Sequence, residues 1–156
     1  IGKGSFYRFF ESKEALFLAV QEREEEAFKR ALLREAEAAA SAREAVRLLL
    51  RTAVTRLDDH PFLRLLLDPQ TLRELVVRVD PARLAAHREA DRDFFVSVIH
   101  DWKRRGWLRE ALPDQVAFDV LTAMFVLSTQ RELLGPEATD RATAELAEAL
   151  ADRWCP

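Results

Sequence analysis

The sequence predicts an all-α fold, and three observations lead to this prediction. No segment shows the sustained alternation of apolar and polar residues that is typical of a half-buried strand. Apolar residues instead recur every three or four positions, as they do on one face of a helix. The residues that interrupt helices fall between these periodic runs: Pro61, Pro69, Pro81, Gly106, Pro113, Gly135 and Pro136. We therefore expect about eight helical segments.

Length and charge suggest one compact body with a distinct N-terminal end. The chain has 156 residues, 49% of them hydrophobic, which is enough for one substantial core. The net charge is −3, but the first 13 residues carry Lys3, Arg8 and Lys13 against Glu11 alone. A basic end on an acidic body is typical of a protein with one end that faces a polyanion.

The composition also indicates the cellular compartment of the protein and which covalent or metal sites to expect. Cys155 is the only cysteine, so we expect neither an internal disulfide nor a thiolate metal cluster. The apolar runs are too short to span a bilayer and the N-terminus lacks a signal-peptide pattern, so we expect a cytoplasmic protein without membrane contact. Since the first residue is Ile1, we also expect the complete protein to have an additional N-terminal portion.

The N-terminal half is expected to contain two long helices. A short helix at 4–9 precedes a turn, after which Ser12 is expected to cap a long helix over 13–40. Ser41 and Glu44 have the spacing of a capping box, which begins a second helix that ends near residues 58–61. Two short helices at 62–67 and 70–79 then follow.

The C-terminal half is expected to form the dimer interface. A long helix at 81–105 ends at Gly106, which suits a left-handed C-terminal cap. The segment 114–134 is apolar nearly all round, so it must be covered on both sides, and a last helix at 139–154 carries small residues that permit close packing. These two helices predict a homodimer that buries Phe118, Leu121, Phe125, Ala142, Leu146, Ala149, Leu150 and Trp154.

The stretch IGKGSFYRFFESKEALFLAV at residues 1–20 resembles the end of the DNA-binding domain of TetR-family transcriptional regulators. The resemblance implies that residues 1–20 are the remainder of a helix-turn-helix domain and that residues 21–156 form a ligand-binding and dimerisation domain. A glycine permits close backbone approach to DNA, a short hydroxyl reaches base edges, and Tyr or Lys suits phosphate. The DNA contacts expected on these grounds are Gly2, Lys3, Gly4, Ser5, Tyr7, Arg8 and Lys13.

The motif departs from the family pattern in two respects. Gly2 occupies a position that is usually Ser in the family, so one contact is expected to be lost. The two helices that normally precede the motif are not in this sequence, so operator DNA is expected to bind only the complete protein. The family's function would then be that of a repressor, released from its operator by an effector that binds between the middle helices.

A small apolar or aromatic effector is expected, because aromatic residues recur at helical spacing along the middle of the chain. His87 and Asp91 lie four residues apart on the same apolar face, where a polar group needs a partner. The expected lining is Phe62, Leu66, Leu75, His87, Asp91, Phe94, Phe95, Val98, Trp102, Phe118 and Phe125.

Other functions receive less support from the sequence. A metal site built from His60, His87 and His100 lacks a recurring ligand spacing, so neither a metal nor another cofactor is expected. The sequence contains no nucleophile–base arrangement and no Gly-rich phosphate loop, so an enzyme is not expected. The alternatives that remain are an all-helical homodimeric interaction module without DNA or ligand, and a small helical enzyme.

Overall fold

The computed structural model describes residues 10, 12–67, 70, 71, 73, 77 and 79–156, and every regular element among them is helical. The expected all-α fold is confirmed. The expected helix at 4–9 lies outside the described residues, as does much of the one expected at 70–79. The elements are α2 (Lys13–Glu37), α3 (Ala42–Thr55), the 3-10 helix η1 (Arg56–Asp59), α4 (Pro61–Leu67), α6 (Pro81–Arg104), α7 (Asp114–Thr129), α8 (Arg131–Leu134) and α9 (Pro136–Trp154).

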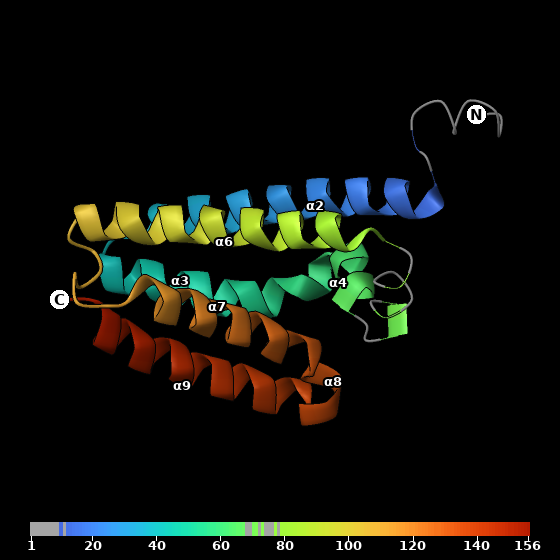
Figure 1. Ribbon diagram of the computed structural model, residues 1–156. Coiled ribbons are helices and arrows are strands. Elements are labelled where there is room, and N and C mark those ends of the chain that lie inside the picture. Colours follow the sequence, from blue (N-terminus) through green and yellow to red (C-terminus); the bar gives the residue numbers. More distant parts are fainter. Residues whose placement is uncertain (1–9, 11, 68–69, 72, 74–76, 78) are drawn as a thin grey trace.

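Helix α3 lies in the middle of the bundle (Figure 1), where it packs against α2, α7 and α9. Its buried side chains extend over more than one face, and they are Ala45, Val46, Leu49, Leu50, Thr52 and Val54. Each buried Val or Leu side chain stabilises the fold by about 1.5–3 kcal/mol through removal of apolar area from water. A helix that is buried on several sides fixes the positions of its neighbours, and α3 therefore organises the rest of the chain.

Polar side chains at the expected positions start the helices. The Ser12 hydroxyl accepts a hydrogen bond from the Ala15 amide at 3.0 Å, and Ser41 accepts one from the Glu44 amide at 3.2 Å. Asp80 accepts a hydrogen bond from the Ala82 amide at 2.9 Å, one residue after Pro81. Each acceptor satisfies an amide that has no partner inside its helix.

Helix α2 ends at Glu37 rather than at residue 40. Ser41 must adopt an extended backbone, with φ −151° and ψ 159°, to cap α3. The chain therefore has to leave the helical conformation a few residues earlier, and the Ala38 amide closes the last turn on the Arg34 carbonyl at 3.2 Å. Capping of one helix thus determines the end of the preceding one.

The segment 114–134 is not one continuous helix. It divides at Gln130, whose amide bonds to the Leu127 carbonyl at 3.1 Å and closes a tight turn between α7 and α8. Helix α9 begins at Pro136 rather than at residue 139, because Gly135 turns the chain with φ +86° and a proline needs no amide partner in the first helical turn. Within one chain Val116 and Val126 are exposed, so the expectation that both sides of this segment are covered would require a second copy.

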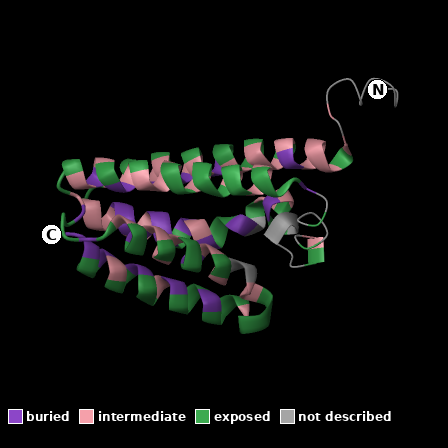
Figure 2. Ribbon diagram, viewed as in Figure 1, coloured by how far each residue is buried: buried purple, intermediate pink, exposed green. Residues whose placement is uncertain are grey.

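The inward face of α9 consists of small side chains spaced four residues apart. Thr139, Thr143, Ala147 and Ala151 are all buried, and this face packs against α3. Figure 2 shows the buried positions following one another along α9 and gathering on α3. Small side chains let the two helix axes approach closely, which explains why α3 and α9 form the most extensive helix contact.

The end of α6 adopts the Schellman geometry expected from the sequence. The Gly106 amide bonds to the Lys103 carbonyl at 2.8 Å, and the Trp107 amide bonds to the Trp102 carbonyl at 2.8 Å. Gly106 has φ +70°, a left-handed conformation that favours glycine. The following loop is tied to the C-terminus, since the Arg109 amide bonds to the Trp154 carbonyl at 2.7 Å.

Only the C-terminal part of α6 reaches the hydrophobic core. Its buried residues are Ile99 and Trp102, whereas the first half of the helix has intermediate and exposed positions, as Figure 2 shows. Helix α6 therefore stands away from α3 along its first half. The space that results is the candidate functional site.

Candidate functional site

A cavity of about 570 Å³ lies between α2, α3, α6 and α7. Its volume is within the range of sites that hold small organic molecules. Helix α3 forms the floor, α2 and α6 form one edge, and α7 forms the opposite wall. The lining residues are Glu25, Phe28, Lys29, Leu32, Leu49, Ala53, Arg88, Glu89, Asp91, Arg92, Phe95, Phe118, Leu121, Thr122 and Phe125.

The two sides of the cavity differ in chemistry. The walls from α3 and α7 are apolar apart from Thr122, and the Phe118 ring lies 6.4 Å from the Phe95 ring, centroid to centroid. All the charged lining residues come from α2 and α6. A molecule with an apolar body and a polar group at one end would match this distribution.

Four polar side chains meet where α2 approaches α6. Lys29 Nζ lies 2.7 Å from Glu25 Oε1 and also pairs with Asp91 Oδ1. His87 Nε2 lies 3.2 Å from Glu25 Oε2 and 3.5 Å from Asp91 Oδ2. We call these four residues the α2–α6 cluster. Each carboxylate directs one oxygen toward Lys29 and the other toward His87.

Proton affinities in the α2–α6 cluster reflect burial and hydrogen bonding. Burial disfavours the Glu25 carboxylate, but hydrogen bonds from His87 and Lys29 outweigh it and lower the pKa of Glu25 to about 2. The hydrogen bond to Glu25 raises the pKa of His87 above its usual value. Burial and the nearby Glu25 charge raise the pKa of Asp91, although Lys29 opposes this.

The α2–α6 cluster separates the cavity from a second hollow of about 440 Å³. Glu25, Lys29 and Asp91 border both spaces, and His87 borders the second one. The second hollow is lined by Glu22, Glu25, Glu26, Lys29, Arg83, Ala86, His87, Ala90, Asp91 and Phe94. A ligand in the cavity would thus lie beside side chains that also face this outer hollow.

Ion pairs join α2 and α6 on both sides of the cluster. Arg83 lies 3.4 Å from Glu22, and Arg105, which directly follows α6, lies 3.4 Å from Glu37. Because residue numbers rise together in these pairs, the two helices run parallel, as Figure 1 shows. Charged side chains are long, so they can connect helices whose backbones remain apart.

The structure places the residues predicted to bind ligand in several environments. Asp91, Phe95, Phe118 and Phe125 line the cavity, whereas His87 and Phe94 line the second hollow. Phe62 packs against Phe17 of α2 with a centroid distance of 4.9 Å. The side chains of Leu66 and Leu75 lie outside the described part of the chain.

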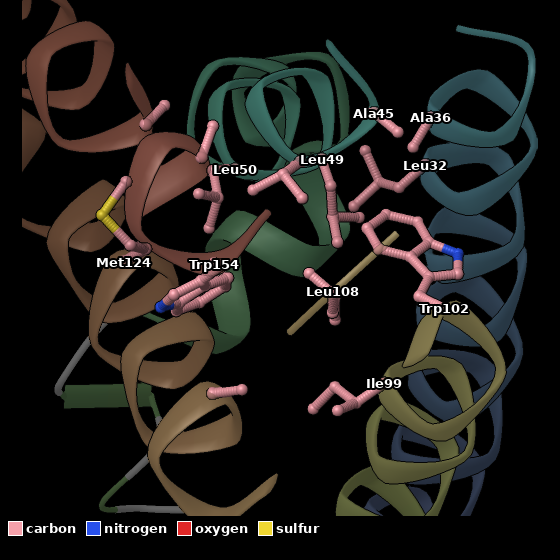
Figure 3. Close-up of a cluster of buried hydrophobic side chains, with 14 of the residues drawn as sticks. Leu32, Ala36, Ala45, Leu49, Leu50, Ile99, Trp102, Leu108, Met124 and Trp154 are labelled. Atoms are coloured by element: carbon pink, nitrogen blue, oxygen red, sulfur yellow. The ribbon is translucent and has the colours of Figure 1, made fainter. Parts of the chain in front are cut away.

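Two predicted lining residues belong instead to the hydrophobic core at the other end of α6. Trp102 is only 2% exposed, and in Figure 3 its side chain points toward Leu32 and Ala36 of α2. Val98 packs against the same core, and both residues border a small apolar space of about 20 Å³ that is too small for an organic effector. The aromatic periodicity of α6 continues from cavity into core, which explains the error.

Of the residues predicted to contact DNA, only Lys13 lies within the described part of the chain. It is the exposed first residue of α2. Gly2, Lys3, Gly4, Ser5, Tyr7 and Arg8 lie outside it. Helix α2 therefore begins inside the motif stretch and continues, through residues 25–32, into the cavity wall.

The residues predicted at a dimer interface also divide into groups. Ala142, Leu146 and Ala149 are exposed on α9, whereas Phe118, Leu121 and Phe125 line the cavity. Leu150 packs against the core, and Trp154 is only 5% exposed, so both already have neighbours within one chain. Trp154 is a core residue rather than an interface residue, because the α9 face that carries it packs against α3.

An exposed apolar surface nevertheless remains on the C-terminal helices. Among the described residues, all the exposed large hydrophobic side chains except Val20 and Val77 belong to α7, α8 and α9. Leu133 is 81% exposed and Leu146 is 44% exposed. We define the α7–α9 surface as Val116, Val126, Leu133, Leu134, Leu146, Ala142 and Ala149.

Comparison with known proteins shows a shared fold. The chain is similar to the solved structure of the fatty acid degradation regulator FadR from Bacillus halodurans, with a TM-score of 0.67 and 14% sequence identity. The similarity covers 97% of this chain and 78% of that chain. The two chains share a fold. No model of a known protein family matches the sequence, and no curated protein matches it significantly.

Among the described residues, no helix combines the length and apolar character needed to cross a bilayer.

Proposed function

We propose that this chain is the effector-binding and dimerisation body of a DNA-binding transcriptional regulator of the TetR type. The cavity carries this proposal. Its α2 wall is continuous with the motif stretch at residues 1–20, so a molecule in the cavity contacts the helix that begins in the DNA-reading segment. The helical fold shared with a fatty acid degradation regulator agrees with this assignment.

The effector that fits best is a small molecule with an apolar or aromatic body. Phe28, Phe95, Phe118 and Phe125 surround the space, and aromatic walls favour apolar guests. The charged edge formed by α2 and α6 gives a polar group at one end of the effector a place to bind. Regulation of fatty acid degradation by the similar protein agrees with an effector that has a long apolar part.

Effector binding would act through the position of α2 relative to α6. A ligand shifts a conformational equilibrium only by its difference in affinity for the two states. Backbone contact between α2 and α6 is slight, and long charged side chains join them. Filling the cavity changes the separation of these helices at small cost, and α2 transmits the change to the DNA-reading segment. Release from operator DNA follows when the effector favours the spacing that does not match DNA.

A homodimer would bring two reading segments to one operator. The α7–α9 surface is the proposed interface, because exposed large apolar side chains on neighbouring helices are typical of a site of association. A two-fold dimer presents the same surface from both copies and matches a palindromic operator.

The cavity can be tested with a fluorescent apolar dye such as anilinonaphthalene sulfonate, with palmitate as the competitor. Ala53 lies in the cavity floor, so Ala53→Phe fills the space without adding charge. We expect Ala53→Phe to weaken dye binding at least about tenfold, which corresponds to roughly 1.4 kcal/mol. The matched control is Ala85→Phe, at an exposed position of α6, and it should bind the dye as the unchanged protein does.

Two outcomes would contradict the assignment of the cavity. One is dye binding that palmitate displaces equally well from the unchanged protein and from Ala53→Phe. The other is absence of saturable binding to the unchanged protein, which would favour the homodimeric interaction module without ligand. Far-UV circular dichroism of both variants shows whether each retains the helical fold.

A further inference from the structure

Three metal-binding side chains converge where α2 meets α6. Glu25, His87 and Asp91 each offer one ligand atom, and these atoms lie within 4.8 Å of one another. His87 and Asp91 are one helical turn apart on α6, and Glu25 comes from α2. A pair of ligands at positions i and i+4 of one helix, completed by a ligand from a neighbouring helix, is a common way to build a metal site.

The two distances from His87 agree with the geometry of a tetrahedral ion. His87 Nε2 lies 3.2 Å from Glu25 Oε2 and 3.5 Å from Asp91 Oδ2. Two ligands with bonds of about 2.0–2.1 Å to a tetrahedral ion are roughly 3.3–3.4 Å apart, since that is the edge of such a tetrahedron. The Glu25 and Asp91 oxygens lie within 4.8 Å of each other, so the two carboxylates would rotate toward each other to complete the set.

Lys29 does not occupy the position that an ion would take. Its ammonium pairs with Glu25 Oε1 and Asp91 Oδ1, whereas the oxygens near His87 are Glu25 Oε2 and Asp91 Oδ2. Lys29 therefore orients both carboxylates through the oxygens that do not face His87. Hydrogen bonds of this kind to the ligands are a regular part of metal sites.

We propose that Glu25 Oε2, His87 Nε2 and Asp91 Oδ2 bind a divalent first-row transition-metal ion, with Zn²⁺ as the reference ion. The second hollow of about 440 Å³ gives the ion a route from solvent, because all three ligands border it. Three protein ligands leave one position for water or for a polar group of another molecule. Imidazole with carboxylate is a donor set that suits Zn²⁺ and Mn²⁺.

The ion would fasten α2 to α6 beside the cavity. In the structure, ion pairs join the two helices at this place. Ion pairs break and become hydrated more readily than bonds to a coordinated metal ion do. Metal binding would therefore restrict the same helix separation that the proposed effector changes. The assignment of the metal ligands does not depend on that function, because it follows from the positions of the three side chains.

The test is a Zn²⁺ titration of the chelator-treated chain in competition with a chromophoric chelator, followed by the same titration with Mn²⁺. We expect one Zn²⁺ per chain, and we expect His87→Ala and Asp91→Asn to lower the affinity by about 100-fold or more. His100→Ala is the control histidine, because His100 pairs with Asp114 at 2.6 Å and is not part of the cluster. Cys155→Ser controls for the single free thiol.

Thermal unfolding separates metal binding from loss of fold. Zn²⁺ should raise the melting temperature of the unchanged chain, of His100→Ala and of Cys155→Ser, but not that of folded His87→Ala. X-ray absorption at the zinc edge should report only nitrogen and oxygen ligands. The proposal is overturned by the absence of saturable binding, by affinity that survives both His87→Ala and Asp91→Asn, or by a sulfur ligand. None of these results bears on dye binding in the cavity.

Discussion

Lys29 of α2 and Asp91 of α6 form an ion pair across the border between the two hollows, and Lys29 also holds Glu25. The ammonium additionally lies 5.9 Å from the centroids of the Phe94 and Phe95 rings. One cation therefore joins two helices, two carboxylates and the aromatic edge of the cavity.

Lys29→Ala should destabilise the chain, because it leaves two half-buried carboxylates without their ammonium partner. We expect the free energy of unfolding to fall by about 2 kcal/mol, less than for a fully buried pair because solvent reaches the site. Arg30→Ala is the control on the same helix, since Arg30 pairs with Glu26 on the surface, and it should change stability by about 0.5 kcal/mol or less. Urea unfolding measures both, and equal effects of the two substitutions would contradict the role given to Lys29.

Gly106→Ala should also destabilise the protein, through backbone strain alone. Gly106 has φ +70°, and a methyl group added there would meet no atom within 4 Å. The expected loss is about 1–2 kcal/mol, the usual cost of a left-handed conformation for an L-residue. Gly106→Asn should lose less, because asparagine tolerates this conformation better. Thermal unfolding ranks the stabilities of the original chain and the two variants. An alanine variant as stable as the original would refute the role of this cap.

Asp114 should contribute to stability in a pH-dependent manner. Hydrogen bonds from Lys103, at 2.7 Å, and from His100, at 2.6 Å, lower the pKa of this carboxyl group. Because the pKa is lower in the folded chain, the contribution is complete above the unfolded value of about 3.9 and is lost as the pH falls through the folded value. At neutral pH, Asp114→Asn should lose up to about 1 kcal/mol, as exposed ion pairs do.

Thermal unfolding of the Asp114→Asn variant across a pH series tests this contribution. The difference in melting temperature from the original chain should shrink as the pH falls below about 4. A difference that stays constant down to the most acidic condition would show that the carboxylate charge is not responsible. Ala123→Gly, at an exposed position of the same helix that carries no polar side chain, is a control that should show no such pH dependence.

Leu146→Glu should break the proposed homodimer. Leu146 belongs to the α7–α9 surface, where a buried charge in the interface would lack a partner. Light scattering at micromolar concentration should give a dimer for the original chain and a monomer for the variant. Ala85→Glu, which adds the same charge on α6, should remain dimeric. A monomeric original chain would contradict the proposed interface.

Local signals in the sequence predict most of the helices and several of their caps. Ser12, Ser41 and Gly106 act through groups within a few residues of themselves, so their roles can be read without tertiary structure. The division of segment 114–134 at Gln130 has no such local marker, since glutamine is an ordinary helix residue. The sequence therefore does not predict this division.

The candidate site could be predicted only in part. Periodicity identifies the apolar faces, but core and cavity share that periodicity, so Phe95 and Trp102 look alike in sequence although only Phe95 lines the cavity. Neither Glu25 nor Lys29 stands out in the sequence as a site residue, because their partners His87 and Asp91 lie about 60 residues away in sequence. Only the parallel packing of α2 and α6 brings them together.

The most direct test of the proposed function is operator binding by the complete gene product, measured with and without palmitate. The account predicts that the original protein binds a specific sequence in its own upstream DNA and releases it when palmitate is added. Ala53→Phe should bind the same DNA but no longer release it, and Ala85→Phe should respond as the original does. Release that is unchanged in Ala53→Phe, or DNA binding without sequence preference, would contradict the account.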